Sequence, residues 1–451
     1  MGDHELQRQL NSRQVTFMAL GTAIGVGLFL GSGQAISLAG PSILLAYLIG
    51  GIAIFFIMRA LGEMAVNQPI SGSFSAYASQ YLGPLAGYLT GWNYWIMMIG
   101  AGIAETTAVG IYMQFWFPEV PQWAWVCASV ISIGALNMLS VKIYGELEFW
   151  FTLIKVLAIL LLIAGGLSII LLGWGNAGQA IYFSNLWQHG GWFPNGILGM
   201  LMAIPIAFCG LAGIEMVGIA AGEAAQPERT IPRAVNSVVW RILVFYIGSL
   251  LVILALYPWQ QIGTQGSPFV ITFEKLGIRQ AAGIINFVVI TAALSAFNSI
   301  LFCNGRMLQS LALQKHAPAI LSTVNKQGVP ARAIVISLVC LAIGIVLNYL
   351  FPEHLFAWLI ALLSFNAIWT WYMILLAHYR FRQTQTTTVT KNNFPMPMWP
   401  VGSWVVMLFM GFILGMMAYM PETRPSIFVG FGWLAFMTIL YKILIHNRAT
   451  N

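Results

Sequence analysis

Twelve long apolar runs follow one another along this chain of 451 residues. Each run approaches or exceeds the roughly 20 residues that a helix needs to cross about 30 Å of hydrocarbon at about 1.5 Å per residue. Only 7% of the residues are charged, against about 25% in soluble proteins, so the chain cannot cover itself with a polar surface. We therefore predict an all-α polytopic membrane protein embedded in a lipid bilayer. The predicted spans lie near 15–36, 43–66, 86–115, 122–141, 149–173, 196–221, 238–257, 280–310, 333–350, 355–378, 402–420 and 427–446.

The basic residues predict how these spans are oriented. With the N-terminus inside, sixteen of the twenty Lys and Arg residues fall in cytoplasmic segments. The positive-inside rule then places both termini in the cytoplasm. The same topology accounts for the net charge of +7, and because the basic residues form no stripe on a soluble domain, we expect no nucleic-acid partner. The sequence leaves the oligomeric state open.

No soluble domain interrupts the spans, since the longest polar stretch is the Thr-rich segment 380–400. We interpret 1–451 as one transmembrane transporter domain. Residues 15–173 and 196–378 form two five-span halves, and residues 402–446 add two peripheral helices. The two spans with the most unusual sequences are the first and the sixth, which take corresponding positions in the two halves. This arrangement is typical of inverted-repeat secondary transporters.

The first span carries five glycines within residues 21–33 (GTAIGVGLFLGSG), and the sixth carries Pro205 followed by CGLAGIE at 209–215. A glycine inside a helix costs about 1 kcal/mol relative to alanine, and a freed backbone group in lipid costs more unless it is bound. Either the glycines let helices pack closely, or both spans are discontinuous helices that present N–H groups to an anionic group such as a carboxylate. The paired breaks favour one binding site near the membrane midplane.

Three ionisable residues lie well inside predicted spans, where a charge costs on the order of 2.5–3.5 kcal/mol. Because burial disfavours the charged form of a lysine, Lys155 suits a proton carrier; the alternative is a permanent charge held by the carbonyls of a broken helix. Glu215 follows the sixth-span break, and either accepts bonds from N–H groups of the following half-helix or meets a substrate ammonium or a proton. Glu105 serves proton or substrate chemistry, or a buried polar contact with a neighbouring span.

The remaining charged and metal-binding side chains favour structural roles. Glu63 and Glu223 lie near inner span ends beside Arg59 and Arg229, where gate or interfacial salt bridges explain them. The histidines are scattered without ligand spacing, and the four cysteines fall inside apolar runs without a CxxC pair. We therefore expect neither a metal site nor a disulfide.

The chain also carries a series of collinear motifs. They are GTAIGVGLFLGS at 21–32, AGPS at 39–42, MRALGEM at 58–64, GWNYW at 91–95, YGELEFWF at 144–151 with Lys155, AGEA at 221–224, IPRA at 231–234, GSPFV at 266–270, SAFNS at 295–299 and GRML at 305–308. With these motifs the chain resembles, nearly end to end, the bacterial amino-acid permeases of the amino acid-polyamine-organocation superfamily. The resemblance is to the branch that holds proline, threonine, aromatic amino-acid and aminobutyrate permeases.

This resemblance implies a LeuT-type fold with broken first and sixth helices, and proton-driven import of an L-amino acid across the bacterial inner membrane. It also implies that the first-span glycine segment holds the substrate carboxylate, and that backbone carbonyls of the sixth span receive the α-ammonium. The implied substrate-binding residues are Ile24, Gly25, Gly27, Ser32, Cys209, Gly210 and Leu211.

The resemblance further implies that Lys155 fills the place where sodium-coupled relatives hold an ion. The proton is then the coupling ion, sodium is not expected, and no other cofactor is needed. Glu215 and Glu105 are further candidates for proton coupling. One position departs from the family, because relatives often carry an aromatic residue in the sixth-span break, where it can cover bound substrate. Leu211 stands there instead, so either Phe208 takes that role or the pocket is roomier.

Other functions fit the sequence less well. An exchanger on the same fold is the nearest rival, because no residue distinguishes net import from one-for-one exchange. A membrane-embedded enzyme would need a nucleophile–base pair, a metal cluster or paired aspartates, but the chain's sole aspartate is Asp3, so we expect no catalytic residues. An amino-acid sensor would need a signalling domain, which the short tails do not offer. Few fixed charges favour a neutral substrate, although Glu105 could serve a cationic one.

Overall fold

The computed structural model describes residues 17, 21, 24–70, 72–139, 141–174, 178–224, 226–262, 268–270, 279–353, 355–385 and 394–443. Both chain ends, whose orientation the basic residues predict, lie outside the described residues. The same holds for residues 22 and 23 of the first-span glycine motif and for residues 266 and 267 of the motif at 266–270.

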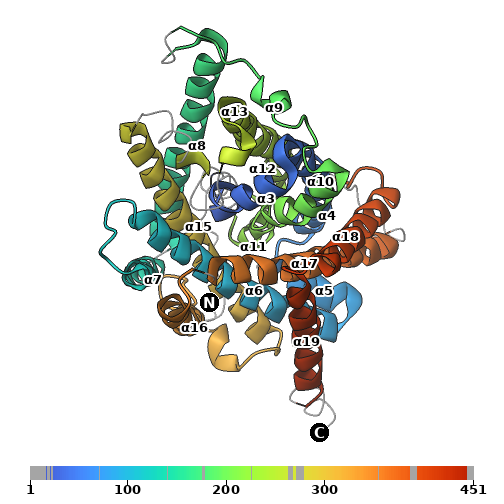
Figure 1. Ribbon diagram of the computed structural model, residues 1–451. Helices are drawn as coiled ribbons and strands as arrows, with labels where there is room; N and C mark the ends of the chain where they lie inside the picture. Colours follow the sequence, from blue (N-terminus) through green and yellow to red (C-terminus); the bar gives the residue numbers. More distant parts are fainter. Residues whose placement is uncertain are drawn as a thin grey trace.

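Within the described residues the chain forms helices and no strand, which confirms the all-α prediction (Figure 1). The α-helices are α2 (Val26–Phe29), α3 (Gly31–Ala39), α4 (Ile43–Asn67), α5 (Ser73–Leu82), α6 (Pro84–Met113), α7 (Gln122–Leu139), α8 (Val141–Leu172), α9 (Asn185–Gln188), α10 (Gly196–Cys209), α11 (Met216–Ala220), α12 (Pro227–Arg241), α13 (Ser249–Leu256), α15 (Arg279–Leu313), α16 (Ala331–Leu350), α17 (Leu355–Gln385), α18 (Val401–Tyr419) and α19 (Arg424–Tyr441). Short helices of other types are η1 (Gly40–Ser42), η2 (Ala221–Glu223), η3 (Ile242–Gly248), η4 (Trp259–Gln261) and η5 (Ala319–Ser322).

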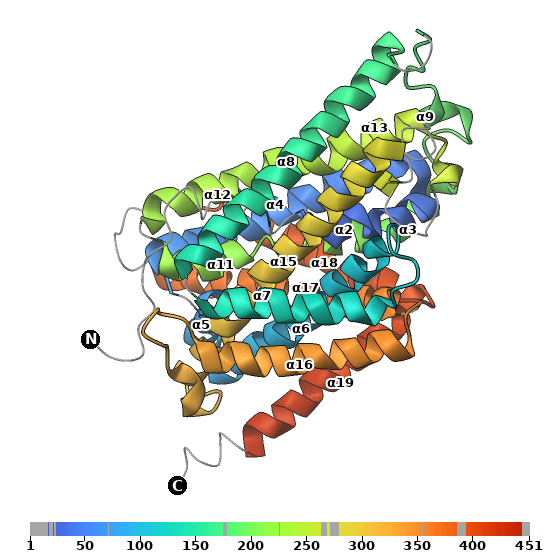
Figure 2. The same ribbon diagram turned by 90° about the vertical axis from the view of Figure 1, so that its left-hand side faces the viewer.

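Nine helical segments of the described chain are long and apolar enough to cross a membrane, and α10 is a shorter apolar helix. The chain is therefore a polytopic membrane protein, while the count of twelve spans and the division into inverted repeats stay predictions. Each predicted apolar run overlaps at least one of the helices above. In Figure 2, α6, α7 and α16 run roughly side by side, and α8 and α15 cross them at a tilt.

Two helices begin earlier than the apolar runs within them. The helix α8 begins at Val141 rather than near 149, and α12 begins at Pro227 rather than near 238. Hydropathy locates the part of a helix that matches hydrocarbon, whereas a helix continues through polar residues as long as its backbone bonds are satisfied. The additional first turns of α8 bring Glu148 inside the bundle, where it is 1% exposed. The helix α5 was not predicted at all, because its sequence is not apolar enough to stand out.

Both predicted breaks are present. Ile24 and Gly25 are not helical and α2 begins only at Val26; the sixth span is helical to Cys209, turns through residues 210–215 and resumes at Met216. The backbone of Gly213 has φ +100°, a conformation that side-chain-bearing residues rarely adopt. The prediction of discontinuous first and sixth helices therefore holds as geometry.

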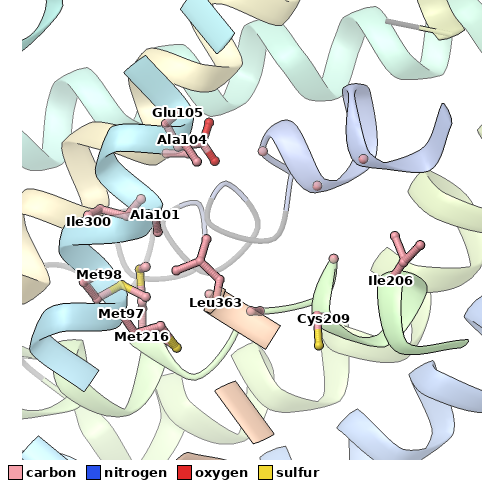
Figure 3. Close-up of a pocket in the computed structure, with 17 residues that line it drawn as sticks. Met97, Met98, Ala101, Ala104, Glu105, Ile206, Cys209, Met216, Ile300 and Leu363 are labelled. Atoms are coloured by element: carbon pink, nitrogen blue, oxygen red, sulfur yellow. The ribbon is translucent and has the colours of Figure 1, made fainter. Parts of the chain in front are cut away.

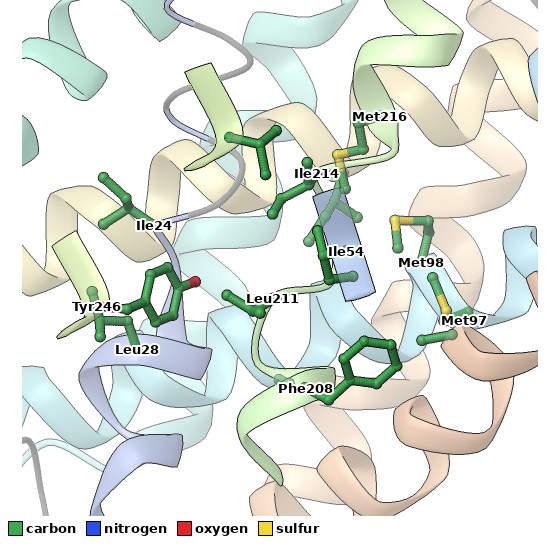
Figure 4. Packing of buried hydrophobic residues seen from close by; sticks show 14 of the residues in the cluster. Ile24, Leu28, Ile54, Met97, Met98, Phe208, Leu211, Ile214, Met216 and Tyr246 are labelled. Carbon is green, nitrogen blue, oxygen red and sulfur yellow. The ribbon is translucent and has the colours of Figure 1, made fainter. Parts of the chain in front are cut away.

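The two breaks touch each other through their backbones. A Cβ atom on Gly27 would lie 2.9 Å from the carbonyl oxygen of Gly210, closer than real Cβ contacts come. The glycines thus serve close packing as well as helix interruption, so the two explanations drawn from the sequence apply together. Around the breaks lies a cluster of buried apolar side chains that includes Ile24, Leu211 and Tyr246 (Figure 4). Its packing fixes where the breaks meet.

Candidate functional site

A cavity of about 100 Å³ lies where the two breaks meet. This space holds several water molecules or part of a small ligand, since about 10–15 Å³ suffices for one water when the space is measured in this way. The helices α2, α3, α6, α10, α11, α15 and α17 and the turn at 210–215 supply its walls. The lining residues are Gly25, Gly27, Gly31, Met97, Met98, Ala101, Ala104, Glu105, Ile206, Cys209, Gly210, Ala212, Gly213, Met216, Ala296, Ile300 and Leu363.

Four of the seven predicted substrate-binding residues line this cavity, and three do not. Gly25, Gly27, Cys209 and Gly210 belong to the lining.

The other three, Ile24, Ser32 and Leu211, are buried nearby but outside the lining. Ser32 uses its hydroxyl to donate a hydrogen bond to the carbonyl of Leu28 at 2.5 Å, and Leu211 packs into the apolar cluster of Figure 4. Because a turn alternates which side chains face inward, consecutive positions in the break do not all reach the cavity.

The aromatic ring of Phe208 does not cover the cavity. It is fully buried against Trp371, at 4.6 Å between ring centroids, and against Phe409, at 5.5 Å. Of the two alternatives left by the sequence, the structure therefore excludes Phe208 as the aromatic cover in this conformation. The lining at the break consists instead of Cys209, Gly210, Ala212 and Gly213.

Glu105 is the one acidic side chain in the lining, and α6 places it directly against the first break. Its Oε1 atom would lie 2.6 Å from a Cβ atom on Gly25. Only a glycine lets this carboxyl group approach the chain so closely. Glu105 is 7% exposed, and Figure 3 shows it at one end of the pocket. It therefore faces the place where the sequence predicts the substrate carboxylate.

Glu215 stabilises the sixth-span break and does not belong to the cavity lining. Its carboxylate accepts hydrogen bonds from the backbone N–H of Gly213 at 3.1 and 3.2 Å, from the hydroxyl of Tyr94 at 3.3 Å and from Nε1 of Trp371 at 3.3 Å. The backbone N–H group that Glu215 binds belongs to the break itself, whereas one of the sequence interpretations was that Glu215 binds N–H groups of the following half-helix. An unpaired N–H group in this apolar interior would cost about 1–3 kcal/mol.

Lys155 binds the backbone of the first-span break. Its Nζ donates hydrogen bonds to the carbonyl of Gly21 at 2.6 Å, to the carbonyl of Ile24 at 3.3 Å and to the hydroxyl of Ser295 at 3.0 Å. The side chain is fully buried. The ammonium group thus binds two carbonyl oxygens at the break, of which that of Gly21 also accepts the backbone N–H of Ile24 at 3.1 Å.

Glu148 is a buried carboxylate of this region that the sequence reasoning missed. It accepts hydrogen bonds from Ser295 at 2.8 Å, from Thr152 at 3.3 Å and from Asn298 at 3.3 Å. It was missed because the predicted span began at 149. The spacing of Glu148, Thr152 and Lys155 was the available signal, since positions i, i+4 and i+7 share one face of a helix.

Glu63 and Glu223, for which the sequence predicted salt bridges near span ends, both form salt bridges. Glu63 binds His378, at 2.9 Å from Nε2, and also Arg382, while Arg59 donates to Asn236 at 3.0 Å.

Glu223 pairs with Arg306 at 2.6 Å, and both side chains are buried. Arg229 was predicted only because it is near in sequence, whereas α15 brings Arg306 from a distant part of the chain. Among the described residues, no group of three or more His, Cys, Asp and Glu side chains is placed to hold a metal ion.

An apolar helical bundle that encloses a small cavity at two helix breaks is typical of secondary transporters. The family model described as amino acid permease matches residues 14–448, and the chain belongs to this family.

Named relatives cover almost the whole chain. The chain is 51% identical over 438 residues to the uncharacterized amino acid permease YtnA of Bacillus subtilis. The aligned region covers 97% of this chain and 95% of that relative. It is 44% identical over 451 residues to the probable threonine/serine transporter YbxG of Bacillus subtilis, with 100% of this chain and 98% of the relative aligned. It is also 44% identical over 441 residues to the aromatic amino acid transport protein AroP of Escherichia coli, with 97% of this chain and 95% of the relative aligned. The protein is thus a multi-pass transporter of amino acids and not an enzyme.

Proposed function

We propose that the protein imports a neutral L-amino acid by proton symport, with the cavity at the two breaks as its substrate site. The observation that carries the proposal is that the breaks meet at Gly27 and Gly210, beside an apolar cavity, while Lys155 binds carbonyls at the first break. One site then has backbone groups for the substrate and a buried amine for the coupling ion.

The substrate backbone binds to the chain's own backbone in this proposal. Gly25 and Gly27 lie at the start of α2, where N–H groups and the positive end of the helix dipole favour a carboxylate. On the opposite wall, the carbonyls at Cys209 and Gly210 favour the α-ammonium group. The carbonyl of Gly210 already accepts a bond from Tyr246 at 3.0 Å, and a carbonyl oxygen has two lone pairs, so it retains capacity for a second donor.

Lys155 is the proposed proton carrier. When it is charged, it donates hydrogen bonds to the carbonyls of Gly21 and Ile24 and to the hydroxyl of Ser295, and stabilises the first break. When it loses its proton, these three hydrogen bonds weaken and the break is free to rearrange. A sodium ion would need the same carbonyl oxygens, so the amine argues against sodium dependence. Glu105 and Glu215 are the further candidates for proton transfer.

The lining supports a neutral substrate. Among its described residues, which are mostly apolar, Glu105 carries the one carboxyl group and no side chain is basic. An anionic substrate side chain would therefore lack a counter-charge. A cationic substrate could use Glu105, and for this reason a cationic amino acid is the alternative within the same fold. The expected location is the bacterial inner membrane, with both termini in the cytoplasm.

Amino-acid exchange is the second candidate, since Lys155 could serve as a fixed structural cation. Uptake into liposomes that contain purified protein decides between the two. The twenty amino acids are screened under an inward proton gradient, with and without sodium. Accumulation that collapses with a protonophore and ignores sodium supports symport. Uptake confined to vesicles preloaded with amino acid would overturn symport in favour of exchange.

A further inference from the structure

The cavity has two chemically different ends. Met97 and Met98 of α6 and Met216 of α11 gather at one end, which we call the thioether end, and Glu105 lies at the other (Figure 3). Met98 and Glu105 are seven residues apart, which places them on one face of α6, two turns or roughly 10 Å apart. The small side chain of Ala101 lies between them and leaves the passage open.

We propose that the thioether end is the substrate side-chain subsite, and that it selects amino acids with large apolar side chains over those with a hydroxyl group. The inference rests on the proposed role of the cavity as substrate site. With the α-carboxylate held near Gly25, at the Glu105 end, and the α-ammonium near Gly210, the room left for the side chain lies along α6 toward Met98. The side chains of leucine, methionine and phenylalanine are long enough to contact the thioethers.

Hydrogen bonding at this end disfavours serine and threonine. The described lining offers few strong hydrogen-bonding side chains. They are the carboxyl group of Glu105 and the thiol of Cys209, which donates to the carbonyl of Ser364 at 3.8 Å, while the methionine sulfurs are only weak acceptors. A substrate hydroxyl at the thioether end therefore exchanges its water for a weak contact with sulfur. The expected discrimination against a hydroxyl group in an apolar pocket is about ten- to a hundredfold.

Discrimination among large apolar side chains is expected to be small. Methionine has three rotatable bonds and a polarisable sulfur, so a surface made of three methionines adapts to different shapes and contacts aromatic ring edges favourably. Surfaces of this kind are typical of binders that accept several partners. Because the methionines can adapt to each of them, leucine, methionine and phenylalanine should bind within about tenfold of one another.

The test is equilibrium binding of tritiated L-leucine to detergent-purified protein, displaced by unlabelled methionine, phenylalanine, serine and threonine. We expect methionine and phenylalanine to displace the label at concentrations within tenfold of leucine, and serine and threonine to need at least ten times more. Serine or threonine as the tighter ligand, or no binding of leucine, would overturn the inference. No proton gradient is present, so a failure of proton coupling leaves this ranking unchanged and is detected separately in the uptake assay.

Variants of Met98 test whether the thioether end selects the substrate side chain. Met98→Gln places an amide at the thioether end and should strengthen the binding of threonine relative to that of leucine by tenfold or more. Met98→Leu should retain the wild-type ranking of affinities. Met113→Gln is the matched control, because Met113 belongs to the same helix and lies outside the lining. If Met98→Gln does not fold, Met216→Gln makes the same test from the opposite wall. An unchanged ranking in the folded glutamine variant would assign selection elsewhere.

Discussion

Lys155 and Glu148 are joined through one hydroxyl group. Ser295 accepts a hydrogen bond from Nζ of Lys155 at 3.0 Å and donates one to Oε1 of Glu148 at 2.8 Å. All three side chains are buried by at least 99%. A buried charge is tolerated when a nearby opposite charge and hydrogen bonds compensate it. The carboxylate of Glu148 therefore supplies compensation for the ammonium group that holds the first break.

Lys155→Ala should abolish accumulation driven by a proton gradient and retain some substrate binding. The variant removes the amine that bonds to Gly21 and Ile24, while the cavity lining is unchanged. Lys155→Met, which keeps the length of the side chain, should behave in the same way. Uptake with and without a protonophore is the measurement. Full concentrative uptake by either variant contradicts a coupling role for Lys155.

Glu148→Gln should weaken uptake driven by a proton gradient, because the buried ammonium group of Lys155 loses the carboxylate that compensates it through Ser295. Uptake with and without a protonophore is the measurement. Glu146→Gln on the same helix is the control, since Glu146 is partly exposed and should leave uptake unchanged. Equal uptake by the two variants would remove Glu148 from the coupling machinery.

Gly25→Val should block substrate binding, because its Cβ alone would lie 2.6 Å from Oε1 of Glu105. Gly27→Ala should disturb the site through the backbone, since the added carbon meets the carbonyl of Gly210 at 2.9 Å. The control is Gly165→Ala in α8, where nothing lies within 4 Å of the added carbon. We expect at least tenfold weaker binding for the first two and no loss for the control. Wild-type transport by Gly25→Val contradicts this placement of the site.

Cys209 offers a test of the site that does not depend on transport. It lines the cavity and is partly exposed, whereas the other three cysteines lie outside the lining. In a variant whose only cysteine is Cys209, a bound amino acid should slow alkylation by a small maleimide several-fold. The rate of modification is followed by mass spectrometry. Equal rates with and without saturating substrate would place the substrate away from the sixth-span break.

The buried pair of Arg306 and Glu223 should contribute to stability only as a pair. Removing one partner leaves an uncompensated buried charge, so Arg306→Met or Glu223→Met alone should cost about 3–5 kcal/mol. The double variant should recover most of this loss, because neither charge remains. Thermal unfolding in detergent of the wild type, both single variants and the double variant gives the interaction energy. Additive losses would show that the two residues act independently.

Several parts of this structure follow from local sequence alone. Apolar runs predict where the long helices lie, and the glycines at 21–33 and the sequence at 209–215 predict both breaks. Lys155 and Glu215 stand out because a charge inside an apolar run needs compensation. The residues that these breaks and charged side chains contact elsewhere in the chain were not predictable. Gly27 and Gly210 are far apart in sequence, and no local pattern indicates that their backbones touch.

The amino-acid sequence by itself determined the class of protein, the helices and the two interruptions. These features depend on transfer of side chains into hydrocarbon and on backbone conformation, both of which are local quantities. The tertiary structure decided which of the candidate site residues face the cavity, and that Phe208 does not cover it. It also decided that Glu148 contacts Lys155 through Ser295, and that three methionines meet at one end of the cavity. These features depend on which helices pack together, and that is a property of the whole bundle.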